Sequence, residues 1–126
     1  MKKILKVFIS SPYKDNIKLN TNLAKGYAKF AVSKGVLPIV PHVYFPMLLD
    51  LNEEDIAQRK QGIDLGLVLM EACDELWVFG DAMTEGMLDE LNLWVKLKGK
   101  TKVFFYDKAA NQSDKKIYDF DEEGIL

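Results

Sequence analysis

The fold is decided by residues 4–13, which read ILKVFISSPY. The first six residues of this stretch are mostly apolar and rich in β-branched side chains, which is typical of a strand buried on both faces of a parallel sheet. The apolar run stops at residues 10–12, and Asp15 or Asn16 can cap a helix that follows. The stretch therefore predicts a buried strand, a turn and the beginning of a helix.

The same alternation continues along the chain. Apolar residues recur at helical spacing over residues 17–34, and residues 36–40 have the pattern of a second short strand. After an irregular aromatic segment, Asn52 can cap a second helix whose first turn is acidic. The remaining expected elements are a strand at 74–80, a helix that Thr84 caps and Gly99 closes, with Leu88, Leu91 and Val95 inward, and a strand at 102–106.

Strands that alternate with helices predict an α/β fold with right-handed crossovers. We expect a flavodoxin/Rossmann-like three-layer α/β/α domain over residues 1–106, with a four- to five-stranded parallel sheet. Residues 107–126 are then a polar, acidic C-terminal extension, in which residues 116–120 are a candidate edge strand.

Composition excludes several classes of protein. The chain has 126 residues and a net charge of −2, with no basic stripe, so we expect no nucleic acid polymer as a partner. No apolar segment approaches the ~18 residues that cross a bilayer, so we expect no membrane partner. Cys73 is the single cysteine, which rules out an intramolecular disulfide and fits a cytoplasmic protein.

In sheets of this kind the ligand lies outside the carboxyl ends of the strands. Three loops are expected there, at residues 10–13, 41–52 and 80–85. We expect them to bind a small molecule. The sequence has neither a Walker A motif nor a glycine-rich dinucleotide motif, which argues against nucleoside triphosphate hydrolysis and against a Rossmann dehydrogenase. We expect no cofactor.

Two of these loops offer candidate binding residues. Ser10 and Ser11 can hold an anion such as phosphate, or they simply turn the chain and help to cap the helix. Tyr44 and Phe45 can stack on a planar ring, or they belong to the core. His42 is the only histidine, which excludes a multi-histidine metal site, and it is either a structural hydrogen-bonding residue or a base. We expect no metal.

The third loop and its helix carry four acids, Asp81, Glu85, Asp89 and Glu90. Side chains lean toward the N-terminus of a helix, so Glu90 would lean toward the crevice above Gly86, where the missing side chain leaves space for a ligand. A carboxylate placed there can attack a sugar carbon while another acid assists the leaving group. Alternatively, these acids are solvated and are enriched because the helix dipole stabilises them.

Arg59 is the only arginine of the chain. Its planar guanidinium can clamp an anion, or it can pair with an acidic residue on the surface.

Four segments, residues 9–13, 38–42, 73–81 and 84–90, resemble a phage- and prophage-associated domain of unknown function. That domain is similar to the nucleoside 2-deoxyribosyltransferase superfamily, and the resemblance covers residues 4 to about 106. In that superfamily a glutamate attacks C1′ of the deoxyribose, and a second base or water then displaces the sugar.

The resemblance implies roles for individual residues. Glu90 falls on the position of the nucleophile. Ser10, Ser11 and Tyr13 match the loop that contacts sugar and phosphate, and the loop around His42 matches the one that holds the base. The resemblance also implies a homodimer or a larger homo-oligomer.

One position departs from the family pattern. Gly66 stands where the family has a catalytic aspartate, and the nearest candidate is Asp64. Two residues along a helix rotate a side chain by about 200°, so Asp64 need not face the same way.

The leading hypothesis is therefore an N-glycosidase or deoxyribosyltransferase acting on a deoxynucleoside or its monophosphate, with Glu90 and Asp64 as catalytic residues. Arg59, Asp81, Thr84 and Gly86 are further substrate-binding candidates. The alternatives are a catalytically silent nucleotide-binding or sensing module, and a structural oligomer subunit. Tyr44, Phe45 and Trp94 are either interface residues of an oligomer or core residues.

Overall fold

The computed structural model describes residues 3–44, 56–80, 83–99, 102–106 and 117–119. The strands are β1 (Lys6–Ser10), β2 (Leu37–Ile39), β3 (Glu75–Phe79), β4 (Val103–Tyr106) and β5 (Ile117–Asp119). The helices are α1 (Ile17–Ser33), α3 (Ile56–Ala72) and α4 (Glu85–Lys98). Residues 41–44 are also helical. None of the helices within the described ranges is long and apolar enough to cross a membrane.

The strands form one sheet in the order β2-β1-β3-β4-β5. The first four strands are parallel, which confirms the predicted α/β fold, whereas β5 pairs antiparallel with β4. A parallel fifth strand would need a crossover of about a dozen residues or more. Only residues 107–116 separate β4 from β5, so β5 returns beside β4 in the opposite direction.

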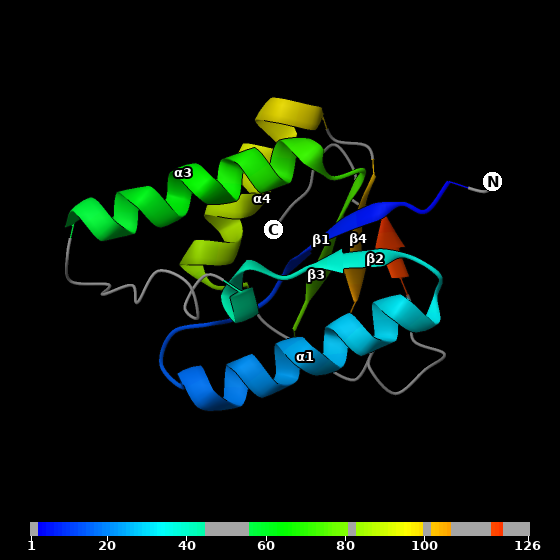
Figure 1. Cartoon of the computed structure of the whole chain (residues 1–126), viewed down its shortest axis with the longest axis horizontal. Helices are drawn as coiled ribbons and strands as arrows, with labels where there is room; N and C mark the ends of the chain where they lie inside the picture. Colours follow the sequence, from blue (N-terminus) through cyan, green and yellow to red (C-terminus); the bar gives the residue numbers. More distant parts are fainter. Residues whose placement is uncertain (1–2, 45–55, 81–82, 100–101, 107–116, 120–126) are drawn as a thin grey trace.

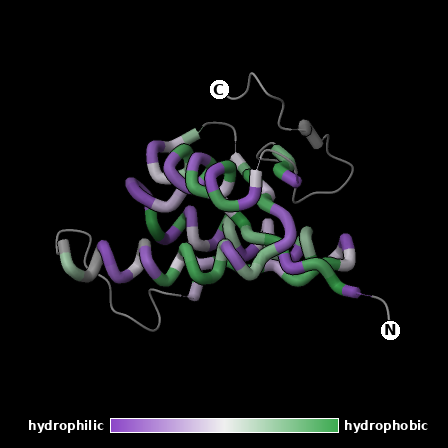
Figure 2. The backbone as a smooth tube through the Cα atoms, turned by 90° about the horizontal axis from the view of Figure 1, so that it is seen from above, coloured by the Kyte–Doolittle hydropathy of each residue, from purple (hydrophilic) through white to green (hydrophobic). Residues whose placement is uncertain are grey.

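Helices cover both faces of the sheet (Figure 1). Successive side chains of a strand point to opposite faces, so Val7 and Ile9 of β1 pack with α1 while Phe8 packs with α3 and α4. Figure 2 shows hydrophobic and hydrophilic residues alternating along the helices, as expected when each helix turns one side to the sheet.

Helix α4 packs through a stripe at i, i+4 and i+7, namely Met87, Leu91 and Trp94. Trp94 is 0 % exposed, so it belongs to the core and is not available as an interface residue. Leu88 is 39 % exposed, and its expected inward position is therefore wrong, because it lies one residue away from this stripe.

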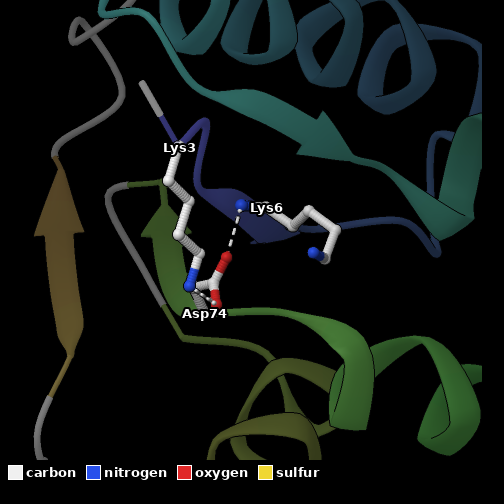
Figure 3. Close-up of polar contacts among 3 residues, drawn as sticks. All are labelled: Lys3, Lys6 and Asp74. Carbon is white, nitrogen blue, oxygen red and sulfur yellow. Dashed lines mark hydrogen bonds and ion pairs between the residues drawn. The ribbon is translucent and has the colours of Figure 1, made fainter. Parts of the chain in front are cut away.

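At the amino ends of the strands, Asp74 joins the end of α3 to β1 (Figure 3). Its backbone N–H donates to the carbonyl of Lys6 at 2.7 Å, and the Lys6 backbone N–H donates to its carboxylate at 2.8 Å. The ammonium of Lys3 lies 3.6 Å from the same carboxylate. The backbone hydrogen bond from Lys6 holds the pKa of Asp74 below its usual range.

The connections from β1 and β2 set the point where the order of strands reverses. Helix α1 leads from β1 to β2 on one side, and α3 then leads to β3 on the other side of β1. The order of strands therefore reverses beside β1, and the crevice of such a sheet lies outside the carboxyl ends of β1 and β3. Ser10 ends β1 at this edge, in register with Val78 of β3.

Candidate active site

A hydrogen bond between Ser10 and Glu90 lies at the carboxyl end of β1. Ser10 is 1 % exposed, and alternation along β1 turns its side chain to the same face as Phe8, toward α4. Its Oγ donates to Oε1 of Glu90 at 2.7 Å, although the two residues are 80 positions apart in the sequence. The structure thus brings together the predicted nucleophile and the first predicted loop.

The local sequence of α4 determines where Glu90 lies. Thr84 caps the helix, since its Oγ1 accepts a hydrogen bond from the backbone N–H of Met87 at 3.2 Å. Glu90 lies on the helix beside the buried Met87 and Leu91, so packing directs it toward the sheet. Gly86, one turn earlier, is exposed, and apart from its neighbours and its own helix backbone no described atom would lie within 4 Å of a Cβ built there. The approach to Glu90 from the helix N-terminus is therefore open at this residue.

Burial changes the acidity of Glu90. Desolvation is the largest effect and raises the pKa of its carboxyl to about 7. The hydrogen bond from Ser10 opposes this shift by stabilising the charged form, and the charge of Asp89 adds to it. A carboxyl with a pKa near 7 exchanges its proton at neutral pH, which suits either a nucleophile or a general acid.

The turn between β1 and α1 is held by two asparagines. Asn16 caps α1 by accepting a hydrogen bond from the backbone N–H of Leu19 at 3.2 Å. The Asn20 side-chain amide donates to the carbonyls of Tyr13 at 3.1 Å and Lys14 at 3.0 Å. These bonds fix the backbone on which Tyr13 is mounted.

Tyr13 and His42 join the first and second predicted loops. Their rings are stacked, with centroids 4.7 Å apart and planes 16° from parallel. His42 lies in the helical residues 41–44, directly after β2. The stack therefore holds the two loops against each other.

Ser11 differs from Ser10 in its partners. It is 2 % exposed, and within the described residues its Oγ has no hydrogen-bond partner. A buried hydroxyl without a partner is costly unless a ligand or water completes it.

Other predicted site residues are exposed or use their side chains in other contacts. Tyr44 is 54 % exposed, and Thr84 uses its hydroxyl as a helix cap. Asp64 has a side chain that is 57 % exposed and pairs with Lys60 at 3.0 Å, one turn earlier on α3. Its catalytic role stays a prediction.

Three predictions concern positions that the structure does not describe. Phe45 and Asp81 lie outside the described residues, and so does the side chain of Arg59, although its backbone belongs to α3. Elsewhere in the described ranges, no cluster of three or more histidine, cysteine, aspartate or glutamate residues is arranged to hold a metal ion.

Cys73 is buried, and desolvation raises the pKa of its thiol to about 11. A thiol of this kind is protonated at neutral pH and does not act as a nucleophile.

Sequence reasoning missed Asn20. The signal was available, since an asparagine four residues after a helix cap can reach back to the preceding turn, but helix positions of this kind are usually solvated. The stacking of Tyr13 on His42 was not predicted from the sequence either, because a contact between two loops depends on the arrangement of the sheet.

A family model described as "Domain of unknown function (DUF7768)" matches residues 5–104. The chain belongs to this family. No curated protein matches the sequence.

Among solved structures, the chain is similar to one described as 2-deoxyribosyltransferase from the psychrotolerant bacterium Bacillus psychrosaccharolyticus. The TM-score is 0.59 and the sequence identity is 16 %, over 81 % of this chain and 72 % of that one. At this identity the likeness shows only that this chain shares the α/β fold of that transferase. The chemistry of the DUF7768 domain has to be argued from its own residues.

Proposed function

We propose that this protein cleaves or transfers the N-glycosidic bond of a deoxynucleoside or deoxynucleoside monophosphate, with Glu90 as the nucleophile. The observation that carries the proposal is the Ser10–Glu90 hydrogen bond of 2.7 Å at the point where strand order reverses. The solved transferase of the same fold supports the choice of substrate class.

The proposed reaction has two steps. An oxygen of ionised Glu90 forms a bond to C1′ of the sugar, and the electron pair of the C1′–N bond leaves with the base, which takes up a proton from solvent water. Water or a second base then attacks C1′ and releases a proton to solvent, and the ester electron pair returns to Glu90. Because the attacking group must be ionised, activity should rise with pH through about 7, the pKa of Glu90.

The surrounding residues offer contacts for the rest of the substrate. Ser11 has a buried hydroxyl that no described residue uses, which suits a sugar or phosphate oxygen. The loop around His42 is proposed to hold the base. The stacked rings of Tyr13 and His42, together with the ring of Tyr44, offer flat aromatic surface for it. Open space at Gly86 would let the sugar approach Glu90.

The test is release of free base. The protein is incubated with the four deoxynucleosides and their 5′-monophosphates, with and without a second base, and free base is measured by chromatography. We expect turnover that Glu90→Gln lowers by a factor on the order of 10³ or more. Glu85→Gln, an exposed residue of the same helix, is the matched control and should keep turnover. Equal turnover in the wild type and Glu90→Gln would refute the proposal.

A second candidate function is a silent nucleotide-binding or sensing module. The position of Asp64 favours this silent module, because the acid is exposed and paired with Lys60. Gly66 stands where the transferase superfamily that the chain resembles has its catalytic aspartate. Saturable binding of a nucleotide without release of base would identify the module. Gly66→Asp separates the two functions further, since a Cβ at Gly66 would meet no atom of the other described residues within 4 Å, beyond its own helix backbone and its neighbours. Base release gained by Gly66→Asp would show that the missing acid silences the site.

We further propose that the protein forms a homodimer or larger homo-oligomer. With Trp94 in the core, the support comes from Tyr44, at 54 % exposed, and from Val68 of α3, at 66 % exposed. Light scattering at micromolar concentration tests this, and a monomeric mass would contradict it.

A further inference from the structure

The bond from Ser10 leaves the two oxygens of Glu90 in different environments. Oε1 accepts from Ser10 Oγ at 2.7 Å, whereas no described residue donates to Oε2. We propose that Ser10 is a positioning residue, which holds Oε1 and thereby makes Oε2 the atom that attacks C1′. This inference rests on the proposed function and assigns the tasks of two neighbouring serines within it.

Ser10 is suited to hold another group in place. It belongs to β1, which pairs with β2 on one side and with β3 on the other, and its side chain is buried. A serine side chain has a single torsion that moves its oxygen, so the sheet fixes the position of Oγ. Glu90 has three such torsions and would lose considerable entropy if nothing else held it.

The hydrogen bonds of Ser10 and Ser11 indicate different roles for the two serines. A serine hydroxyl carries one proton, and Ser10 donates its proton to Glu90, so that proton cannot also be donated to a sugar or phosphate oxygen. Ser11 keeps a proton that no described residue receives, and it is buried at the same end of β1. We therefore assign Ser10 to the nucleophile and Ser11 to the substrate.

The bond also serves the second step of the reaction. In the glycosyl ester, Oε1 is a carbonyl oxygen, and it regains negative charge when water or a base displaces the sugar. A donor already in place stabilises this returning charge without reorganisation. A distance of 2.7 Å is in the range of a charge-assisted hydrogen bond.

Three variants test the inference. Ser10→Ala removes the donor, and Ser10→Thr keeps a hydroxyl at the same position. Ser33→Ala is the control, since the Ser33 hydroxyl donates to the Phe30 carbonyl within α1. The carboxyl of Glu90 is titrated by carbon NMR in substrate-free protein, with Glu90→Gln used for assignment, and kcat and KM are measured for base release.

We expect Ser10→Ala to raise the pKa of Glu90 and to lower kcat at pH 7 about tenfold, with little change in KM. Ser10→Thr should restore most of both values, and Ser33→Ala should change neither. The charge of Asp89, which also raises the pKa of Glu90, is the same in every variant.

Two results overturn the inference. One is an unchanged Glu90 titration in Ser10→Ala. The other is a loss that falls on KM alone, which would mean that Ser10 contacts the substrate. If the wild type releases no base at all, the proposed function fails, and the titration still decides whether Ser10 holds the Glu90 carboxylate.

Discussion

At the scale of single residues, Glu90 has a carboxyl whose charged form is disfavoured by desolvation, and this carboxyl accepts a hydrogen bond from Ser10. Desolvation raises the pKa of its carboxyl to about 7, while the Ser10 hydrogen bond partly stabilises the charged form. A carboxylate with a structural role usually has a pKa below its ordinary value, as Asp74 does at the amino ends of the strands. Perturbation of this kind beside a crevice is typical of functional residues.

The acid limb of the pH–activity profile should respond to Asp89. Its negative charge raises the pKa of Glu90, so Asp89→Asn should lower that pKa and move the acid limb of kcat/KM to lower pH. Glu85→Gln, one turn earlier, is the charge-matched control and should leave the limb in place. A limb that moves to higher pH in Asp89→Asn would contradict this explanation of the pKa.

Glu90 should also make the protein less stable as pH rises. The folded state keeps its proton up to a pKa of about 7, whereas the unfolded chain loses it near 4.5, so the folded state binds more protons between these values. The free energy of unfolding should therefore fall from about pH 4.5 to 7, and Glu90→Gln should remove that fall, which is on the order of 1–3 kcal/mol. Urea unfolding across this pH range measures it, and an identical slope in both proteins would count against a half-buried Glu90 that keeps its proton up to about pH 7.

At this scale one rule predicted a side-chain direction. The lean of side chains toward a helix N-terminus predicts that Glu90 turns to the carboxyl ends of the strands, and its side chain accepts a hydrogen bond from Ser10 there, while its role in the site stays a prediction. The Tyr13–His42 stack could not be predicted, because it depends on the conformations of two loops that only the folded sheet brings together.

At the scale of the elements, α4 connects the sequence signals to the position of Glu90. Thr84 and Gly99 were predicted as its cap and its end, and both act so in the structure, with Gly99 at a φ of 84° that favours glycine. The direction of β5 could not be predicted from its apolar pattern, since that pattern is the same for parallel and antiparallel edge strands.

Removing the cap of α4 should destabilise the protein. Thr84→Ala leaves the Met87 N–H without its partner and should cost about 1 kcal/mol in the free energy of unfolding. Thr84→Ser keeps the acceptor oxygen and should recover most of that loss. Urea unfolding of the three proteins measures it, and equal stability of Thr84→Ala and the wild type would show that the cap contributes nothing.

Asp74 should act on stability in the opposite sense to Glu90. The folded state holds the pKa of Asp74 below its usual value, so its contribution is present above the pKa of the unfolded chain and is lost as pH falls through the folded value. Asp74→Ala removes the acceptor for the Lys6 N–H and should cost on the order of 1–2 kcal/mol at pH 7, with a smaller loss at low pH. Lys3→Ala is the control, because the Lys3 pair is mostly exposed and should matter little. A loss that is equal at pH 7 and at pH 3 would contradict the charged role of Asp74.

At the scale of the whole molecule, the order of strands accounts for the convergence of distant segments. The order of strands reverses beside β1. As a result the end of β1, the residues after β2 and the start of α4 lie at the same end of the sheet, where the parallel strands finish (Figure 1). The alternation of strands and helices was enough to predict this edge from the sequence. The second acid was not predictable in the same way, because a two-residue difference in register, from Gly66 to Asp64, decides which side of α3 carries it.

The central claim is that Glu90 forms a covalent bond to the sugar, and mass spectrometry of the acid-quenched protein tests it most directly. After brief incubation with a deoxynucleoside or its monophosphate, we expect the peptide that contains Glu90 to gain the mass of one deoxyribosyl or deoxyribosyl-phosphate group, and we expect no gain in Glu90→Gln. Release of base by the wild type with no modified Glu90, or with the sugar attached to another residue, would contradict the account.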